Sequence, residues 1–382
     1  KGLIQFIIPK SLLFNTYFKD IREYLLTKSK IHEVFMISEK IFPDAEVGGS
    51  LILKYEIVDN PNISNEMKLI SADKYFDYDG QTALVNDISQ EFFLSVPHFE
   101  ISPIAEGANL IVKKLHTLKT IREFYTLKNG LNPGNIKQIL ITDEKLSDNH
   151  KPIIWGKELN TNSIQWGGQF VNYDYNIADN LSLDDIQSKE GMKKQTRIDF
   201  ALRTPDLFET EKIVIRKTGD RFIAAKDNNN YYFDTLVHGI YGNNEEYSLD
   251  FLLTILNSQV ATIFYRLLHD IKGKVFAKIS LDKLGAFPLP GTDFTQRNDI
   301  SQYGLKLQKL QPELNSLKAK FVKYLVAKFQ LLKTSRKLEN WQDLDFGEFI
   351  KELNKAIKAT NKLRDKEGQA PVAILTKTDE FE

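Results

Sequence analysis

The residues best suited to bind a ligand lie between positions 155 and 230, where aromatic and basic side chains are interleaved. The aromatic group comes first, close to several glycines: Trp155, Trp166, Tyr173 and Tyr175. The basic group follows, ahead of a run of asparagines: Arg216, Lys217, Arg221 and Lys226. Arginine and lysine can bind guanine edges, asparagine can bind adenine, and aromatic rings stack on bases. The pattern permits DNA recognition, although surface loops of many proteins share this composition.

Sequence motifs for catalysis are absent. The chain has no GxxxxGK[ST] or GxGxxG phosphate loop, no HExxH and no GxSxG. The stretch from Asp206 to Lys212 superficially resembles a nuclease metal site. That site needs an acid two places before the lysine, where this chain has Thr210. The histidines lie far apart and are better explained as surface or packing residues than as ligands, so we expect no metal site.

The composition is that of a globular protein, with 42% apolar residues, 27% charged residues and a formal net charge of zero. A length of 382 residues allows two or three domains. The absence of cysteine excludes disulfides and thiolate metal sites and fits a cytoplasmic protein. No apolar stretch reaches the ~18 residues of a membrane span and no secretory signal is recognised, so we expect no membrane. Lysines outnumber acids between 301 and 340, which a solvated helix face explains better than phosphate binding.

The first residues predict an α/β arrangement. The run from Leu3 to Ile8 is apolar and ends at Pro9, which is typical of a strand buried on both faces of a sheet. Apolar residues at 14, 18, 21 and 25 predict a helix, and strands are expected at 31–37 and 51–58. Polar turn residues at 59–81 predict a domain boundary. With no earlier strand or glycine-rich loop before it, we expect the strand at 3–8 to be exposed, abnormally paired or covered by another chain.

The remainder predicts a β-rich module followed by helices. A helix is expected at 111–125, and short strands broken by glycine, asparagine and aspartate are expected at 138–142, 169–175, 213–216 and 230–233. Apolar residues from 252 to 268 share one helix face. Two further stripes, at 310–332 and 346–357, predict an antiparallel helical hairpin joined around 340–345. Pro312 is expected in its first turn or at a kink.

Several motifs occur in an order that is similar to that of a known family. The first group lies in the α/β segment: G-L-I-Q-F-I-I-P at 2–9, Leu12-Leu13, Ile21-Arg22 and I-F-P-D-A-E-V at 41–47. The second group lies in the β-rich segment: F-Y and two glycines within 124–134, P-I-I-W-G-K-E-L at 152–159, Tyr173 to Tyr175, K-I-V-I-R at 212–216, Ala225 to Asp227, L-T-I-L-N-S at 253–258 and F-P-L-P at 287–290. The ordered set resembles TaqI-like N6-adenine DNA methyltransferases, which include type IIG restriction–modification enzymes.

The resemblance implies sequence-specific recognition of double-stranded DNA. The full-length enzyme would flip an adenine out of the duplex and methylate its N6 atom with S-adenosylmethionine. Phe42 matches the aromatic residue that stacks on the flipped base in this family. The target-recognition domain of the chain would bind DNA through the following residues: Trp166, Tyr173, Arg216, Lys217, Arg221, Lys226, Lys272 and Lys274.

The resemblance also implies the domain organisation. We expect an α/β fragment of a methyltransferase sheet at 1–58, a connecting linker at 59–115, an α+β, β-rich target-recognition domain at 116–292, and a C-terminal helical hairpin within 293–382. The family's glycine-bearing cofactor loop and its Asn-Pro-Pro-Tyr segment are not found, because Asn60-Pro61-Asn62 is only a turn. We therefore expect the C-terminal part of a methyltransferase that is inactive alone.

This interpretation has partners and alternatives. The expected partners are duplex DNA and a missing N-terminal catalytic portion, and Mg²⁺ would be needed only if the parent protein carries a nuclease. One alternative is a stand-alone specificity subunit that recruits a separate methyltransferase, which leaves the catalytic-type segment at 1–58 unexplained. The other alternative is an interaction scaffold, built on the terminal helices, that does not bind DNA.

Overall fold

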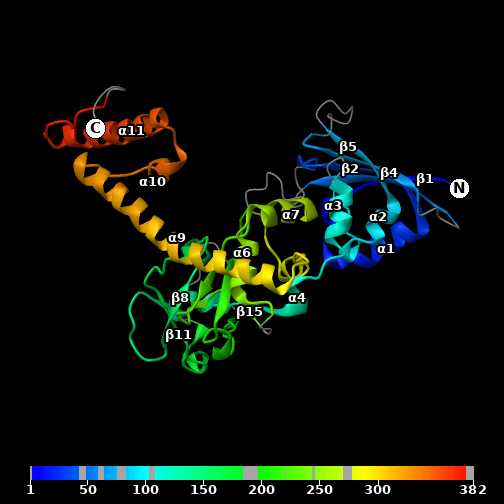
Figure 1. Cartoon of the computed structure of the whole chain (residues 1–382), viewed down its shortest axis with the longest axis horizontal. Helices are drawn as coiled ribbons and strands as arrows, with labels where there is room; N and C mark the ends of the chain where they lie inside the picture. The colour runs from blue at the N-terminus through cyan, green and yellow to red at the C-terminus, as the bar shows by residue number, and fades with distance from the viewer. Residues whose placement is uncertain are drawn as a thin grey trace. The chain divides into compact units, whose positions relative to one another are not determined.

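A computed structural model describes residues 2–42, 49–58, 64–74, 83–102, 108–183, 197–219, 221–242, 246–269 and 278–375. The chain divides into a larger unit, Lys1–Gln302, and a smaller unit, Tyr303–Glu382. Mixed sheets and helices form the larger unit, and the smaller unit is helical (Figure 1).

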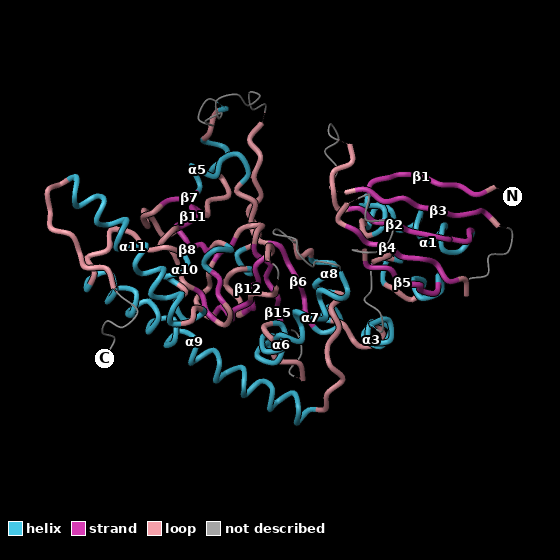
Figure 2. The backbone as a smooth tube through the Cα atoms, turned by 90° about the horizontal axis from the view of Figure 1, so that it is seen from above, coloured by secondary structure: helices cyan, strands magenta, loops and turns pink. Residues whose placement is uncertain are grey.

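The chain begins with a five-stranded mixed sheet in the order β1-β3-β2-β4-β5, whose strands lie side by side in Figure 2. Its strands are β1 (Leu3–Pro9), β2 (Ser29–Ile37), β3 (Ser50–Ile57), β4 (Glu66–Ala72) and β5 (Leu84–Ser89). Only β2 and β4 are parallel. Helices α1 (Lys19–Lys28) and α2 (Gln90–Leu94) pack on one face, where Leu26 and Phe93 are buried against the strands. The α/β arrangement predicted for this segment is therefore observed.

The position of β1 differs from one of the two predictions made for it. The sequence predicts a strand buried on both faces, but β1 pairs only with β3 among the described residues and lies at the edge of the sheet. Its side chains Leu3, Phe6 and Ile7 are exposed, as expected for a strand that lacks neighbours. An apolar run specifies an extended strand, whereas the number of its neighbours depends on residues elsewhere in the chain.

The prediction that residues 59–115 form a linker is wrong. Strands β4 and β5 lie within this range and complete the five-stranded sheet, and helix α3 (Ala108–Leu115) follows them. Asn65, just before β4, and Gln90, just after β5, both bind Ile31 of β2. Asn65 donates to the Ile31 carbonyl at 2.7 Å, and Gln90 accepts from the Ile31 N–H at 2.9 Å. The polar residues around 59–81 therefore connect strands of one sheet, which turn signals alone cannot distinguish from a domain boundary.

The β-rich part that follows contains two four-stranded sheets. The first has the order β13-β12-β15-β6 and is built from β6 (Tyr125–Asn129), β12 (Lys212–Arg216), β13 (Ala224–Asp227) and β15 (Val237–Gly242). The second has the order β14-β8-β11-β7 and is built from β7 (Ile141–Thr142), β8 (His150–Ile154), β11 (Phe170–Asn172) and β14 (Tyr232–Phe233). A short pair, β9 (Leu159–Asn160) and β10 (Ser163–Ile164), lies against β13. Aromatic and branched side chains fill the core of this part, including Phe208, Tyr232 and Phe233.

Three predicted elements of this part are divided differently. Residues 137–140 form helix α5 (Lys137–Leu140), so the strand expected at 138–142 is only β7. The helix expected at 111–125 is split into α3 and α4 (Ile121–Phe124) by a capping box between Thr120 and Glu123. The helix expected at 252–268 is split into α6 (Leu249–Leu256) and α7 (Gln259–His269), because the Asn257 amide binds the backbone of Ala224 and the Ser258 hydroxyl caps α7.

Among the described residues, no single helix has the length and hydropathy of a membrane span; α6 and α7, bent by 70°, reach them only when taken together.

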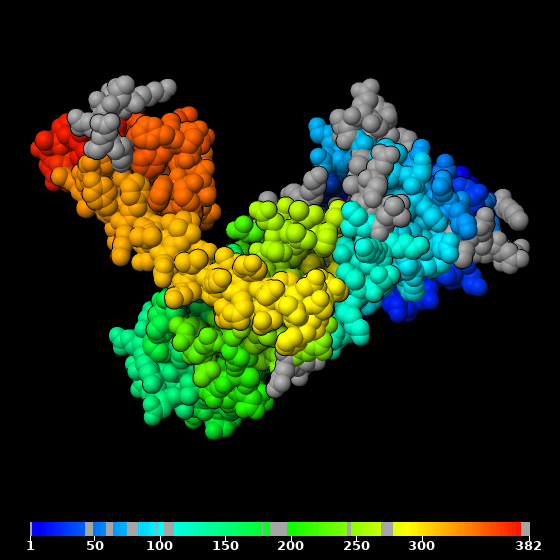
Figure 3. Space-filling model, viewed as in Figure 1, coloured from blue at the N-terminus to red at the C-terminus, as the bar shows by residue number. Residues whose placement is uncertain are grey.

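The smaller unit is built on two long helices. They are α9 (Phe294–Lys328), which begins in the larger unit, and α11 (Phe346–Lys366), with the short α10 (Arg336–Glu339) between them. Leu325, Leu338 and Leu353 are buried where the three helices meet. Figure 3 shows the orange and red atoms of the smaller unit in contact with one another. The C-terminal helical segment predicted from the sequence is therefore observed. Pro312 lies in the interior of α9 and not in its first turn.

Candidate nucleic-acid interface

An open recess of about 370 Å³ lies on the second sheet of the β-rich part. The pairing of β8 with β11 places Pro152 opposite Phe170 and brings distant parts of the sequence to one surface. We call this site the Trp166 recess, and its lining residues are Lys145, Asp148, His150, Lys151, Pro152, Trp166, Phe170, Asn229 and Tyr231. Its volume falls within the ~300–1,000 Å³ that is usual for ligand sites.

Trp166 forms the aromatic wall of the recess and is fixed in place. Its indole N–H donates to the carbonyls of Ile153 and Gln169, each at 3.1 Å. The Gln169 amide is itself held, since it accepts from the Trp155 indole at 2.8 Å and donates to Asp143 at 2.9 Å. The Trp166 ring contacts Phe170 edge-on at 5.2 Å and is 38% exposed. A partly exposed ring whose orientation is already set loses little entropy when a base stacks on it.

A buried ion pair positions the part of the recess that Asn229 and Tyr231 line. Lys212 and Asp227 lie 2.6 Å apart with both side chains fully buried. The Asp227 carboxylate also accepts from the backbone N–H groups of Asn229 at 2.9 Å and Tyr231 at 3.0 Å. Burial lowers the pKa of Lys212, and the charge of Asp227 opposes that shift. The pair therefore holds the loop that carries Asn229 and Tyr231 to the recess.

Asn230 completes this loop with a left-handed backbone, at φ 57°. Asparagine tolerates this conformation better than most residues because its short amide can bind the local backbone. The run of asparagines thus has a structural member, Asn230, and a member that lines the recess, Asn229.

The charges around the recess favour an anionic ligand weakly. Lys145 and Lys151 line it, together with the single carboxylate of Asp148. Each lysine has only a long ion pair, 3.9 Å from Lys145 to Asp148 and 3.9 Å from Lys151 to Glu209, and such exposed pairs contribute little. Two cations, one amide and aromatic rings form a binding surface that can contact phosphates and base edges.

Two of the cations predicted to bind DNA already bind the backbone. The Arg216 guanidinium donates to the carbonyls of Gly156 at 2.7 Å and Leu159 at 3.0 Å, and burial lowers its pKa. The Lys217 ammonium donates to the Thr235 carbonyl at 3.1 Å. Arg221 lies near Arg216 and is exposed. Of these three residues, Arg221 is therefore the one whose charge faces solvent.

Of four further residues predicted to bind DNA, two already contact other side chains and two are not described. Tyr173 is 7% exposed and packs on Tyr232 and Phe208 in the core, so it has no face for a base to stack on. Lys226 forms ion pairs with Glu211 at 2.9 Å and Asp250 at 3.0 Å. Lys272 and Lys274 lie outside the described residues.

Phe42, predicted to stack on a flipped base, lies in the segment between β2 and β3. Its side chain is 47% exposed. The adjacent residues 43–48 lie outside the described part of the chain.

The sequence interpretation found Trp166 and the asparagine run but missed Lys145, Lys151 and Tyr231. The two lysines lie more than a dozen residues before Trp166, and only the β8–β11 pairing brings them to it. The period of two along β8 does not single out Lys151 either, because Ile153 shares its side of the strand and is buried.

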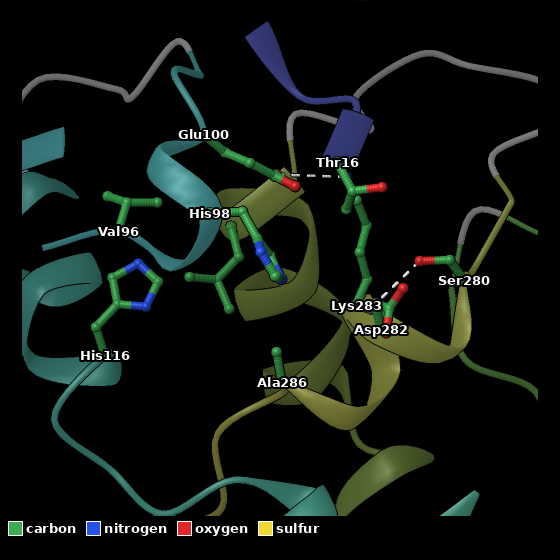
Figure 4. A pocket seen from close by; sticks show the side chains of 10 residues that line it. Thr16, Val96, His98, Glu100, His116, Ser280, Asp282, Lys283 and Ala286 are labelled. Atoms are coloured by element: carbon green, nitrogen blue, oxygen red, sulfur yellow. Dashed lines mark hydrogen bonds and ion pairs between the residues drawn. The ribbon is translucent and has the colours of Figure 1, made fainter. Parts of the chain in front are cut away.

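A second cavity lies inside the larger unit and is shown in Figure 4. It is lined by polar side chains that include His98, Glu100 and Lys283, and its volume is about 50 Å³. Arg22 donates to the His98 carbonyl at 3.1 Å and 2.8 Å and so holds the left-handed His98, and Lys283 pairs with Glu100 at 3.5 Å. Roughly three or four water molecules fit in this space, so it is too small for a nucleoside-sized ligand.

Comparison with known families gives a match to the part of the chain that carries Trp166 and most other residues of the recess. Residues 151–289 match the TaqI-like C-terminal specificity domain. The resemblance to TaqI-like enzymes predicted from the sequence is confirmed over these residues. Residues 293–381 match a domain of unknown function, DUF8810. Comparison with curated proteins returns no match.

Two solved structures are similar to the chain. The type IIL restriction–modification enzyme MmeI, solved in complex with DNA, has 11% sequence identity and a TM-score of 0.50 over 81% of this chain. The type IIG restriction endonuclease BpuSI has 14% identity and a TM-score of 0.33 over 79% of this chain. This chain spans 42% of the length of each. At this identity, the likeness to MmeI concerns the fold.

The described residues do not fit the cofactor that the resemblance implies. The family's glycine-bearing cofactor loop and its Asn-Pro-Pro-Tyr segment are not found in the sequence, and the Trp166 recess is open and carries lysines. Among the described residues no group of histidines and carboxylates could hold a metal ion.

Proposed function

We propose that the chain recognises a specific sequence in duplex DNA through the Trp166 recess and the surface around it. The observation that carries this proposal is that most of the residues that line the recess, Trp166 and Asn229 among them, lie within the stretch that matches a specificity domain, while Lys145 lies just before it. In the proposed complex, Lys145 and Lys151 bind phosphates and fix the register, while Asn229 hydrogen-bonds a base edge. Trp166 stacks on a base or packs on a sugar.

We further propose that the whole enzyme is an adenine-specific methyltransferase of a restriction–modification system. The motifs of the α/β segment support this proposal, as does the exposed ring of Phe42. The reaction would take place in the full-length enzyme with bound S-adenosylmethionine, and a fused nuclease would require Mg²⁺. Flipping of the target adenine costs a few kcal/mol of stacking and pairing, and an aromatic ring such as Phe42 would offset part of that cost.

The five-stranded sheet favours this proposal over a stand-alone specificity subunit. Such a subunit needs a specificity domain but has no use for the sheet formed by β1–β5. A scaffold that does not bind DNA would leave the Trp166 recess and the specificity-domain match without a role.

Selection from a random duplex library tests the recognition proposal. The full chain is used to enrich duplexes at low salt, and the enriched sequences are then measured by fluorescence anisotropy against scrambled duplexes. We expect one enriched motif, bound more tightly than its scrambled versions, with an affinity that falls steeply as salt rises. No enrichment together with undetectable binding at low salt would overturn the proposal.

The methylation proposal has a separate test, because it concerns the whole enzyme. The complete gene is expressed in a bacterial host that lacks adenine methylation, and the host DNA is sequenced by a method that detects N6-methyladenine. We expect methylation at the motif that the chain selects in vitro. Unmodified DNA from cells that contain the folded enzyme would leave recognition intact and refute the methyltransferase assignment.

A further inference from the structure

The first part of α9 carries a heptad repeat of apolar residues. Seven residues follow each other at alternating steps of four and three: Tyr303, Leu307, Leu310, Leu314, Leu317, Phe321 and Tyr324. This spacing of 3.5 residues is that of the a and d positions of a left-handed coiled coil, which face a partner helix as one continuous seam. Leu307, Leu314 and Phe321 take the a positions, and the other four residues take the d positions. We call this row of residues the α9 seam.

Most of the α9 seam is exposed to solvent. Phe321 is partly covered because it packs on Trp341 with ring centroids 4.5 Å apart. The other members of the seam are between 45% and 63% exposed. Scattered apolar residues on a surface are ordinary, but a regular row of leucines and tyrosines on one helix face marks a binding surface.

We propose that the α9 seam pairs with the seam of a second copy of this chain in a parallel, two-stranded coiled coil. In this arrangement each a residue packs against its own copy and each d residue does the same, so Leu310 faces Leu310 and Leu314 faces Leu314. An isologous interface of this kind must be complementary to itself.

The charges beside the seam satisfy that requirement. In a parallel pair, the g position of one helix lies next to the e position of the following heptad on the other helix. Glu313 occupies g and Lys318 occupies the following e, so the two are paired twice across the dimer. Lys306 lies opposite the neutral Gln311, so these positions contain no like-charge pair.

An antiparallel pair is less favourable on the same grounds. The antiparallel register that packs Leu310 on Leu314 brings Glu313 close to its own copy and Lys306 close to Lys320. Like charges at these positions oppose association. The only proline of α9, Pro312, is at position f, which points away from the seam, so its missing N–H does not affect the interface.

The oligomeric state of the full chain tests the proposal. Sedimentation velocity is measured over a range of micromolar concentrations, and we expect a monomer–dimer equilibrium. The variants Leu310→Glu and Leu317→Glu should be monomers, because each places two carboxylates in the seam. The matched control is Leu305→Glu, which changes an exposed leucine at position f of the same helix and should still form dimers.

Cross-linking and charge exchange test the orientation. The chain contains no cysteine, so Leu310→Cys introduces the only thiol. In a parallel pair this variant forms a disulfide with its own copy under mild oxidation. Glu313→Lys should weaken the dimer at least several-fold because it faces Lys318, and the double variant Glu313→Lys with Lys318→Glu should restore it.

Several outcomes would overturn the proposal. A full chain that is monomeric at every concentration would exclude a second copy as the partner, as would a dimer that withstands Leu310→Glu and Leu317→Glu. A monomer that binds a synthetic three-heptad peptide with leucine at a and d and glutamate at e and g would assign the seam to another protein. None of these outcomes bears on DNA recognition, which rests on different residues.

Discussion

At the scale of single residues, Trp166 is the side chain whose removal should affect DNA binding most directly. We expect Trp166→Ala to weaken binding to the selected duplex by about 1–3 kcal/mol, roughly fivefold to 150-fold in Kd, because one stacking surface is lost. Trp166→Phe keeps a ring and should lose less. The control is Leu146→Ala, at an exposed neighbour of Lys145. Equal anisotropy curves for wild type and Trp166→Ala would place DNA elsewhere.

A second residue-scale prediction concerns the buried ion pair that shapes the recess. Asp227→Asn leaves the Lys212 ammonium buried without a counter-charge, so the free energy of unfolding should fall by about 3–5 kcal/mol. Urea denaturation followed by circular dichroism measures this loss. Asp148→Asn, at a fully exposed carboxylate of the same recess, should change stability by less than about 0.5 kcal/mol. Similar losses in both variants would contradict a special role for the pair.

At the same scale, the sequence predicted candidate residues better than it predicted their surroundings. Trp166 was found because aromatic and basic residues cluster around it, and it does line a recess. Tyr173 belongs to the same cluster but points into the core, where it packs on Phe208 and Tyr232 from distant parts of the sequence. Arg216 binds carbonyl groups of a turn about sixty positions earlier, a pairing that no local pattern encodes.

At the scale of elements, the smaller unit should be stabilised by its buried core and not by its exposed leucines. Leu353 of α11 is 0% exposed, whereas Leu363 of the same helix is 46% exposed. We expect Leu353→Ala to lower the stability of the smaller unit by about 2–5 kcal/mol and Leu363→Ala by far less. Hydrogen exchange of α9, α10 and α11 measures the difference. Equal protection in the two variants would argue against the observed core.

Elements were predictable from the sequence where nearby residues determine them, and less so where residues far along the chain do. The strands β1, β2 and β3 and the helices α9 and α11 follow from apolar runs and periodicity. The assignment of β4 and β5 to the first sheet required knowledge of pairing, because β4 lies parallel to β2 across an intervening polar segment. The break between α6 and α7 depends on Asn257, whose amide binds Ala224 in another element.

At the scale of the whole molecule, alkaline pH should act on the larger unit and spare the smaller one. Burial raises the pKa of several tyrosines of the larger unit: Tyr125, Tyr173, Tyr232, Tyr241 and Tyr265. Their folded pKa lies above the unfolded value near 10, so their contribution to stability is complete below pH ~10 and is lost as pH rises further. Each tyrosine adds a slope of up to about 1.4 kcal/mol per pH unit.

The described residues of the smaller unit include no buried tyrosine, because Tyr303 and Tyr324 are both exposed. Limited proteolysis above pH 10 should therefore cleave the larger unit first. Tyrosinate absorbance should rise together with the loss of the β-sheet signal of the larger unit. Cleavage that begins in the smaller unit would contradict this order.

Net charge does not predict DNA binding by this chain, because 51 basic residues are balanced by 51 acidic residues. Attraction to phosphates must then come from a local surface, and the Trp166 recess supplies Lys145 and Lys151. If each lysine binds one phosphate, Lys145→Gln and Lys151→Gln should each make the slope of log K against log salt shallower by about 0.9. Lys362→Gln, at an exposed lysine of α11, should leave the slope unchanged. A slope that changes in Lys362→Gln but not in Lys145→Gln or Lys151→Gln would assign DNA binding to the smaller unit.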